Sequence, residues 1–66
     1  MKRKEKLAIH EENVLKILHS GEEHINDIYE RVKLKGMTWK QLQNTIKRLL
    51  RKKKIVKTSY NYFDLK

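Results

Sequence analysis

The sequence predicts a mainly α-helical domain that ends in a small β-hairpin, and three observations lead to this fold class. Apolar residues recur at helical spacing in three segments before Lys54, and Gly21 and Gly36 separate these segments. After Lys54 the apolar period shortens to two, in runs of β-branched and aromatic residues. A chain of 66 residues is expected to form a single domain. The expected elements are a basic arm over 1–6, helices over 7–20, 26–34 and 38–53, and a hairpin over 54–66.

The first helix is predicted from apolar residues that share one face, namely Leu7, Val14, Leu15 and Leu18. Ser20 and Gly21 then supply a stop signal. The basic arm before this helix need not be ordered. It could lie along a nucleic acid or serve only to keep the chain soluble.

The second helix is expected to be short. Asn26 is a good N-cap for it, and Ile28 and Val32 lie one turn apart on the face that should enter the core. Ile25 is an isolated apolar residue just before this cap, and a one-residue β bridge is expected near it.

The third helix carries the strongest local signals. Thr38 is its expected N-cap, and Gln41, three residues later, can complete a capping box. The apolar residues that follow recur on one side of a helix with 3.6 residues per turn; they are Trp39, Leu42, Ile46, Leu49 and Leu50. Trp39 is expected to be buried, or half-buried at the edge of the helix.

The C-terminal hairpin is predicted from two short runs of β-branched and aromatic residues, 55–58 and 62–65. A three-residue tip, 59–61, separates them. Phe63 and Leu65 alternate onto one face of the second strand and are expected in the core.

The charge of the chain is strongly positive and unevenly distributed. The formal net charge is +9, and the segment from Arg31 to Phe63 holds eleven Lys and Arg residues with no Asp or Glu. Six of the eight acidic residues lie between positions 11 and 30. A fold that gathers the basic segments on one side would present a cationic face to a polyanion. An anionic membrane would also attract it, but the third helix lacks the broad aromatic and leucine face of an interfacial helix.

The outer face of the third helix bears cations and amides, and no acidic residue follows within the helix. A solvated surface helix usually mixes charges of both signs and gains from ion pairs one turn apart. Here like charges repel without local relief. A local cost without structural gain indicates an anionic partner.

Several classes of protein are disfavoured by the sequence. The chain has no cysteine for a disulfide or a thiolate metal site. It has no apolar run of the length of a signal peptide or of a membrane span. We therefore expect a protein of the cytoplasm that associates with DNA and not with a membrane.

Catalysis and metal binding are not expected either. The three histidines, His10, His19 and His24, are spaced so that no two share a helical turn. No spacing rule assembles a nucleophile with its base, and no glycine-rich phosphate loop exists. We expect no enzyme, no cofactor, no metal and no small-molecule ligand.

Three helices followed by a hairpin, with a tight turn between the second and third helices, resemble the winged helix-turn-helix family of DNA-binding domains. The resemblance is to small regulators of the prokaryotic or mobile-element type. Residues 25–32 look like the positioning helix of the family, and residues 38–56 look like its recognition helix running into the first wing strand. The resemblance implies that the third helix enters the major groove of double-stranded DNA. The wing would then touch the backbone or the minor groove.

Carried over by position, the resemblance indicates two groups of DNA-binding residues. The recognition-helix group is Thr38, Lys40, Gln41, Gln43, Asn44, Lys47, Arg48 and Arg51. The wing and backbone group is Lys52, Lys53, Lys54, Lys57, Ser59, Tyr60 and Asn61. Tyr60 is expected to be the exposed aromatic residue of the wing.

Base reading is expected from the amide and guanidinium groups of the third helix. Asn or Gln can pair with adenine, and Arg48 could pair with guanine. Asn44 is the preferred candidate, because Gln41 has a competing duty in the capping box.

Two alternatives to a sequence-specific, repressor-like transcriptional regulator stay open. One is a winged-helix interaction module that binds an acidic protein surface within a larger assembly. The other is a non-specific binder of DNA or structured RNA. Because most regulators of this class bind paired half-sites as dimers, a homodimer is also considered, with Leu7-Ala8-Ile9 as a candidate contact surface.

Overall fold

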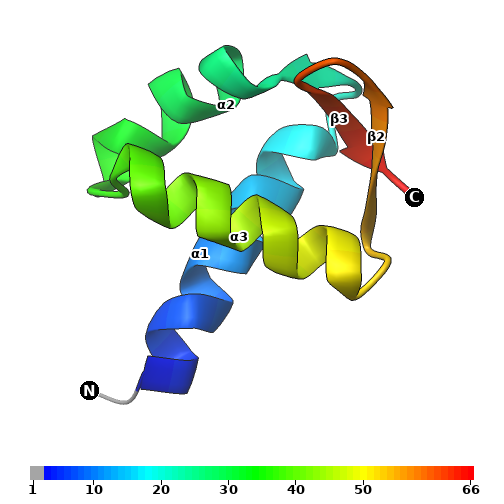
Figure 1. The fold of residues 1–66 in the computed structure, drawn as a ribbon. Helices are drawn as coiled ribbons and strands as arrows, with labels where there is room; N and C mark the ends of the chain where they lie inside the picture. Colours follow the sequence, from blue (N-terminus) through cyan, green and yellow to red (C-terminus); the bar gives the residue numbers. More distant parts are fainter. Residues whose placement is uncertain (1–2) are drawn as a thin grey trace.

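The computed structural model describes the backbone of residues 3–66, with side chains from Ala8 onward. Three helices are followed by an antiparallel hairpin, and the elements occur in the predicted order (Figure 1). They are α1 (Arg3–Leu18), β1 (Glu23–His24), α2 (Ile25–Val32), the short 3-10 helix η1 (Lys33–Lys35), α3 (Trp39–Arg51), β2 (Ile55–Ser59) and β3 (Tyr62–Leu65). The predicted fold class, mainly α with a small sheet, is therefore confirmed.

The three helices pack around one core, and the sheet closes one end of it. In Figure 1, α3 crosses α1, and the hairpin lies beside the C-terminal end of α1. The first turns of α1, drawn in dark blue, extend beyond the other elements (Figure 1). The strand order is β1-β3-β2. The bridge expected near Ile25 is thus confirmed as a two-residue strand, in which Glu23 pairs with Phe63 and His24 with Tyr62.

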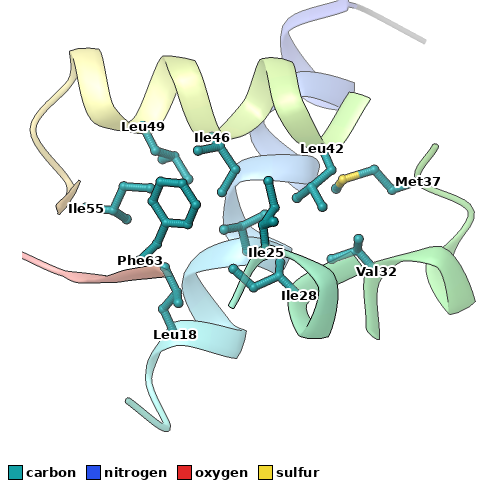
Figure 2. Packing of buried hydrophobic residues seen from close by; sticks show 11 residues of the cluster. Leu18, Ile25, Ile28, Val32, Met37, Leu42, Ile46, Leu49, Ile55 and Phe63 are labelled. Carbon is teal, nitrogen blue, oxygen red and sulfur yellow. The ribbon is translucent and has the colours of Figure 1, made fainter. Parts of the chain in front are cut away.

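The core joins all three helices to both strands of the hairpin, as Figure 2 shows for most of its members. The buried apolar residues are Val14, Leu18, Ile25, Ile28, Val32, Met37, Leu42, Ile46, Leu49, Ile55 and Phe63. Phe63 is buried as predicted, whereas Leu65 is only half-buried. Trp39 was expected to be buried or half-buried, but it is exposed, at 38%. It lies in the first turn of α3, at the edge of the core, and its ring meets Tyr29 of α2 edge-on at 5.2 Å.

The start of α2 differs from the prediction that Asn26 caps it. His24 is the N-cap, and its Nδ1 accepts a hydrogen bond from the backbone N–H of Asn26 at 3.0 Å. The reason is tertiary. Pairing of β1 with β3 holds His24 in an extended conformation, and the N–H of Ile25 donates to the carbonyl of Asn61 at 2.7 Å. The N-cap therefore lies two residues earlier than the local signal indicated.

The other helix boundaries also differ from their expected values. The first helix was expected over 7–20, but it begins at Arg3 and ends at Leu18. Part of the predicted basic arm, from Arg3 to Lys6, therefore belongs to α1, while Met1 and Lys2 lie outside the described residues. The prediction for the side chain of Leu7 also lies outside them. The second helix ends in η1, and the third begins and ends inside the expected 38–53.

The tip of the hairpin is shorter than predicted. Ser59 pairs with Tyr62, so only Tyr60 and Asn61 form the turn, and a bulge interrupts β2 between Lys57 and Ser59. Asn61 has a φ of 62°. Asparagine tolerates this left-handed conformation because its short polar side chain can bond locally. Because the bulge places one extra residue in β2, the turn contains two residues instead of three.

Candidate nucleic-acid interface

The exposed face of α3 is a continuous row of long polar side chains. Lys40, Asn44, Lys47 and Arg51 are all exposed, and they recur at the spacing that places them on one side of a helix. We call these four residues the α3 stripe. The opposite side of α3 is buried in the core through Leu42, Thr45, Ile46 and Leu49. Burial of that side fixes which residues α3 turns outward.

The cations of the α3 stripe are unpaired within the part of the chain whose side chains are described. The ion pairs found there involve other bases, namely Arg31, Lys33, Arg48 and Lys52. Asn44 lies between Lys40 and Lys47 on the stripe, and its amide is exposed. The stripe therefore presents positive charge and one central amide to whatever approaches α3.

The start of α3 is held by the predicted capping box, which is confirmed. Thr38 Oγ1 accepts from the N–H of Gln41 at 3.2 Å, and Gln41 Oε1 accepts from the N–H of Thr38 at 3.0 Å. Both side chains are thus engaged in shaping the helix. Gln43 is exposed beside the stripe and is free of this duty.

Arg48 lies next to the stripe, on the flank of α3 that faces α1. Its Nε donates to Glu11 Oε2 at 3.1 Å, and its guanidinium also donates to Thr45 Oγ1 at 3.1 Å. Lys52 reaches both oxygens of the same carboxylate at 3.1 Å. The expectation that charges on the outer face of α3 repel without relief is therefore wrong for Arg48, because α1 supplies an acid across the helix interface.

The Glu11 carboxylate is held between two cations and is only 12% exposed. Burial by itself would raise the pKa of this carboxyl, but hydrogen bonds from Lys52 and Arg48 and their positive charges outweigh burial. The pKa of Glu11 therefore lies below its ordinary value. Thr45, fully buried beside this site, is satisfied because its hydroxyl donates to the carbonyl of Gln41 at 2.7 Å.

The wing and the turn before it place the remaining predicted site residues at the surface. Lys57, Ser59 and Tyr60 are exposed, and Asn61 is half-buried. Tyr60 is exposed as expected, at 80%, although Tyr62 of β3 is exposed too, at 40%. Lys57 Nζ lies 5.5 Å from the centroid of the Tyr60 ring. Lys53 and Lys54 are exposed in the turn after α3.

A groove runs between α3 and the hairpin and connects the α3 stripe to the wing. Its volume is about 200 Å³, and its lining residues are Ile25, Gln43, Ile46, Lys47, Leu50, Lys57 and Phe63. Lys47 belongs to the stripe and Lys57 to β2, so one groove joins the two sets of exposed bases. No signal in the sequence predicted this groove, because it depends on how closely the hairpin packs against α3.

Glu30 of α2 and Glu23 of β1 pair with bases on that side of the molecule. Lys33 Nζ lies 2.9 Å from Glu30 Oε1, and Arg31 lies 4.0 Å from Glu23. The hydrogen bond that Lys33 donates to Glu30 raises the pKa of the lysine. These pairs neutralise bases around α2 and leave those of the α3 stripe uncompensated.

Among the described residues, no cluster of three or more His, Cys, Asp and Glu side chains could hold a metal ion. No helix within residues 3–66 is long and apolar enough to cross a bilayer.

Comparison with known proteins gives no relative: no protein-family model, curated protein or solved structure matches the chain. The order of three helices and a C-terminal hairpin, with β1 added to the sheet, is winged-helix-like. The fold class is therefore defined by the arrangement of elements alone.

Proposed function

We propose that this protein is a winged helix-turn-helix domain that binds double-stranded DNA with sequence specificity and acts as a repressor-like transcriptional regulator. The observation that carries the proposal is the α3 stripe, whose three cations are exposed and have no acidic partner within the described residues. The major groove of B-DNA is about 12 Å wide and admits an α-helix. A regulator of this kind acts inside the cell, on chromosomal or mobile-element DNA.

In this proposal, α3 lies in the major groove with its stripe toward the bases and the flanking phosphates. Lys40, Lys47 and Arg51 neutralise phosphates and release counterions. Asn44, central on the stripe, is positioned to pair with an adenine edge, and Gln43 is a second amide beside it. Lys57 and Tyr60 of the wing would contact the backbone next to the groove.

Two bases that the sequence indicated for DNA contact have a different role in this proposal. Arg48 and Lys52 are committed to Glu11, so they set the position of α3 against α1. Two copies of the chain would bind paired half-sites. Ala8 and Ile9, exposed in the N-terminal half of α1, offer a contact surface between them.

Selection of bound duplexes from a random pool at near-physiological salt tests this proposal. A recovered motif is expected, and an inverted repeat with half-sites about ten base pairs apart would show two copies on one site. Recovery of no motif, with binding that vanishes as salt rises, would contradict sequence-specific regulation and favour non-specific binding.

Replacement of Asn44 by alanine tests base reading. Binding to the selected site should weaken by about 1–3 kcal/mol, while binding to unrelated duplexes barely changes. Lys53→Gln is the comparison variant, because loss of a phosphate contact should weaken all duplexes alike and flatten the salt dependence by about one unit. If Asn44→Ala weakened both classes of duplex equally, Asn44 would not read a base.

A further inference from the structure

The groove between α3 and the hairpin has an apolar floor and a basic rim. Ile25, Ile46, Leu50 and Phe63 form the floor. Ile46 and Phe63 point toward one another between the helix and the sheet (Figure 2). Lys47 and Lys57 stand on opposite walls, one on α3 and one on β2, and none of the described carboxylates lines the groove.

The size of the groove limits what can occupy it. Its volume of about 200 Å³ is below the about 300–1,000 Å³ that is usual for small-molecule sites. A single bulky apolar side chain is the kind of group that such a volume accepts. The floor favours that group because burying apolar surface from two partners is the main source of binding free energy.

The basic rim indicates which chemical groups of a partner should flank that apolar side chain. Lys47 and Lys57 are both exposed, and neither forms an ion pair within the described residues. A DNA backbone could neutralise them, but it would place phosphates and sugars over an apolar floor. A peptide that carries carboxylates beside an apolar side chain would satisfy the floor and the rim together.

We propose that this groove is a docking site for a protein segment in which one bulky apolar side chain is flanked by aspartate or glutamate. Lys47 also belongs to the α3 stripe and Lys57 to the wing. If α3 binds DNA as proposed above, a docked segment would occupy the same cations and exclude the duplex. The docking site itself does not depend on DNA binding.

The probe is a short fluorescent peptide with one phenylalanine flanked on both sides by aspartates, titrated into the full chain without DNA. Methyl resonances of Ile25, Ile46 and Leu50 should shift as the peptide binds. A matched peptide with alanine in place of phenylalanine should bind at least about tenfold more weakly. Equal binding of the two peptides, or shifts confined to residues outside the groove, would overturn the docking site.

Charge reversal separates the groove from general attraction to a basic protein. Lys57→Glu should weaken peptide binding by about tenfold or more, because it removes one wall cation and adds a repulsive carboxylate. Lys53→Glu changes the net charge equally at an exposed position outside the groove, so it should leave binding within about twofold. Equal losses in the two variants would show only long-range attraction and overturn the proposal.

A competition experiment distinguishes this inference from the proposed function. The peptide should displace a selected duplex, and the alanine peptide should not. A peptide that binds the groove while the duplex stays bound would overturn the exclusion of DNA and leave the docking site standing. If only DNA perturbed the groove methyls, the groove would belong to the DNA interface and the docking site would be overturned.

Discussion

Lys53 adopts a backbone conformation that glycine usually occupies, with a φ of 61°. It follows α3 in a Schellman motif, in which the N–H of Lys53 donates to the carbonyl of Leu50 and the N–H of Lys54 to that of Leu49, both at 3.0 Å. The motif satisfies carbonyls at the end of the helix. A residue with a Cβ pays for this conformation with about 1–2 kcal/mol of strain.

Lys53→Gly should therefore stabilise the domain. The strain energy relieved in the folded state is larger than the stability lost through the greater chain entropy of glycine in the unfolded state. The free energy of unfolding should therefore rise by about 0.5–1 kcal/mol. Urea denaturation monitored by circular dichroism measures this change in stability. Lys53→Ala removes the same charge but keeps the Cβ, so it should give no such gain. If alanine stabilised the domain as much as glycine, charge and not backbone strain would be the cause.

Beside the apolar core, one carboxylate links α1 to the end of α3. Glu11 receives hydrogen bonds from Arg48 and Lys52, which come from the last turn of α3 and its C-cap. Cations at this end also complement the negative end of the helix dipole. One acid on α1 therefore helps to orient the end of α3, while the neighbouring stripe has no acidic partner among the described side chains.

Glu11→Gln should destabilise the domain by about 1–2 kcal/mol at pH 7, between the values for exposed and buried ion pairs. Because the folded-state pKa of Glu11 is below its ordinary value of 4.5, this stabilisation is fully present above pH 4.5. It is lost as the pH falls through the folded-state pKa. The gap in melting temperature between the variant and the natural sequence should therefore shrink in acid.

Glu12→Gln is the control for this prediction, because Glu12 is the neighbouring acid on α1 and is exposed. Thermal melts at neutral and acidic pH should show little change for it at either pH. If the difference in melting temperature between Glu11→Gln and the natural sequence stayed constant across pH, the charge of the carboxylate would not be the source of the stabilisation.

Glu11→Gln should also change DNA binding if the proposed function is right. With the carboxylate neutralised, Arg48 and Lys52 become available to phosphates. Affinity for unrelated duplexes should rise, and the salt dependence should steepen by about one to two units. Electrophoretic mobility shifts with unrelated duplexes at several salt concentrations measure this. Unchanged binding would mean that both bases lie too far from the duplex to reach it.

At the scale of the whole molecule, the fold separates compensated from uncompensated charge. Ion pairs with acids are made by Arg31, Lys33, Arg48 and Lys52, whereas other bases stay exposed, among them Lys40, Lys47, Arg51, Lys53 and Lys57. A polyanion would therefore meet the net charge of +9 chiefly at the exposed bases that have no acidic neighbour. This distribution determines how strongly salt should affect binding to a polyanion.

Five phosphate contacts, from Lys40, Lys47, Arg51, Lys53 and Lys57, predict a slope of about −4.5 in log affinity against log salt, at about −0.9 per contact. Fluorescence anisotropy of a labelled duplex across a salt series gives this slope. Lys47→Gln should make it shallower by about 0.9. A slope near zero for the natural sequence would contradict a binding mode based on the stripe and wing.

The sequence by itself determined the features whose causes are local. Thr38 and Gln41 predicted the capping box because its two hydrogen bonds join residues three positions apart. Apolar periodicity predicted the buried side of α3, and therefore the α3 stripe, because helix geometry alone relates the two faces. The change of period after Lys54 predicted the hairpin and the burial of Phe63.

Only the tertiary structure decided the features that depend on contacts between distant segments. Glu11 lies 37 residues from Arg48 and 41 from Lys52 in the chain, so its pairing follows from the packing of α1 on α3. The N-cap moved to His24 because pairing of β1 with β3 extends that residue. The groove exists because the hairpin packs beside α3. Local patterns determine which faces are apolar and which are charged, but packing determines which charged side chains meet a partner and which stay exposed.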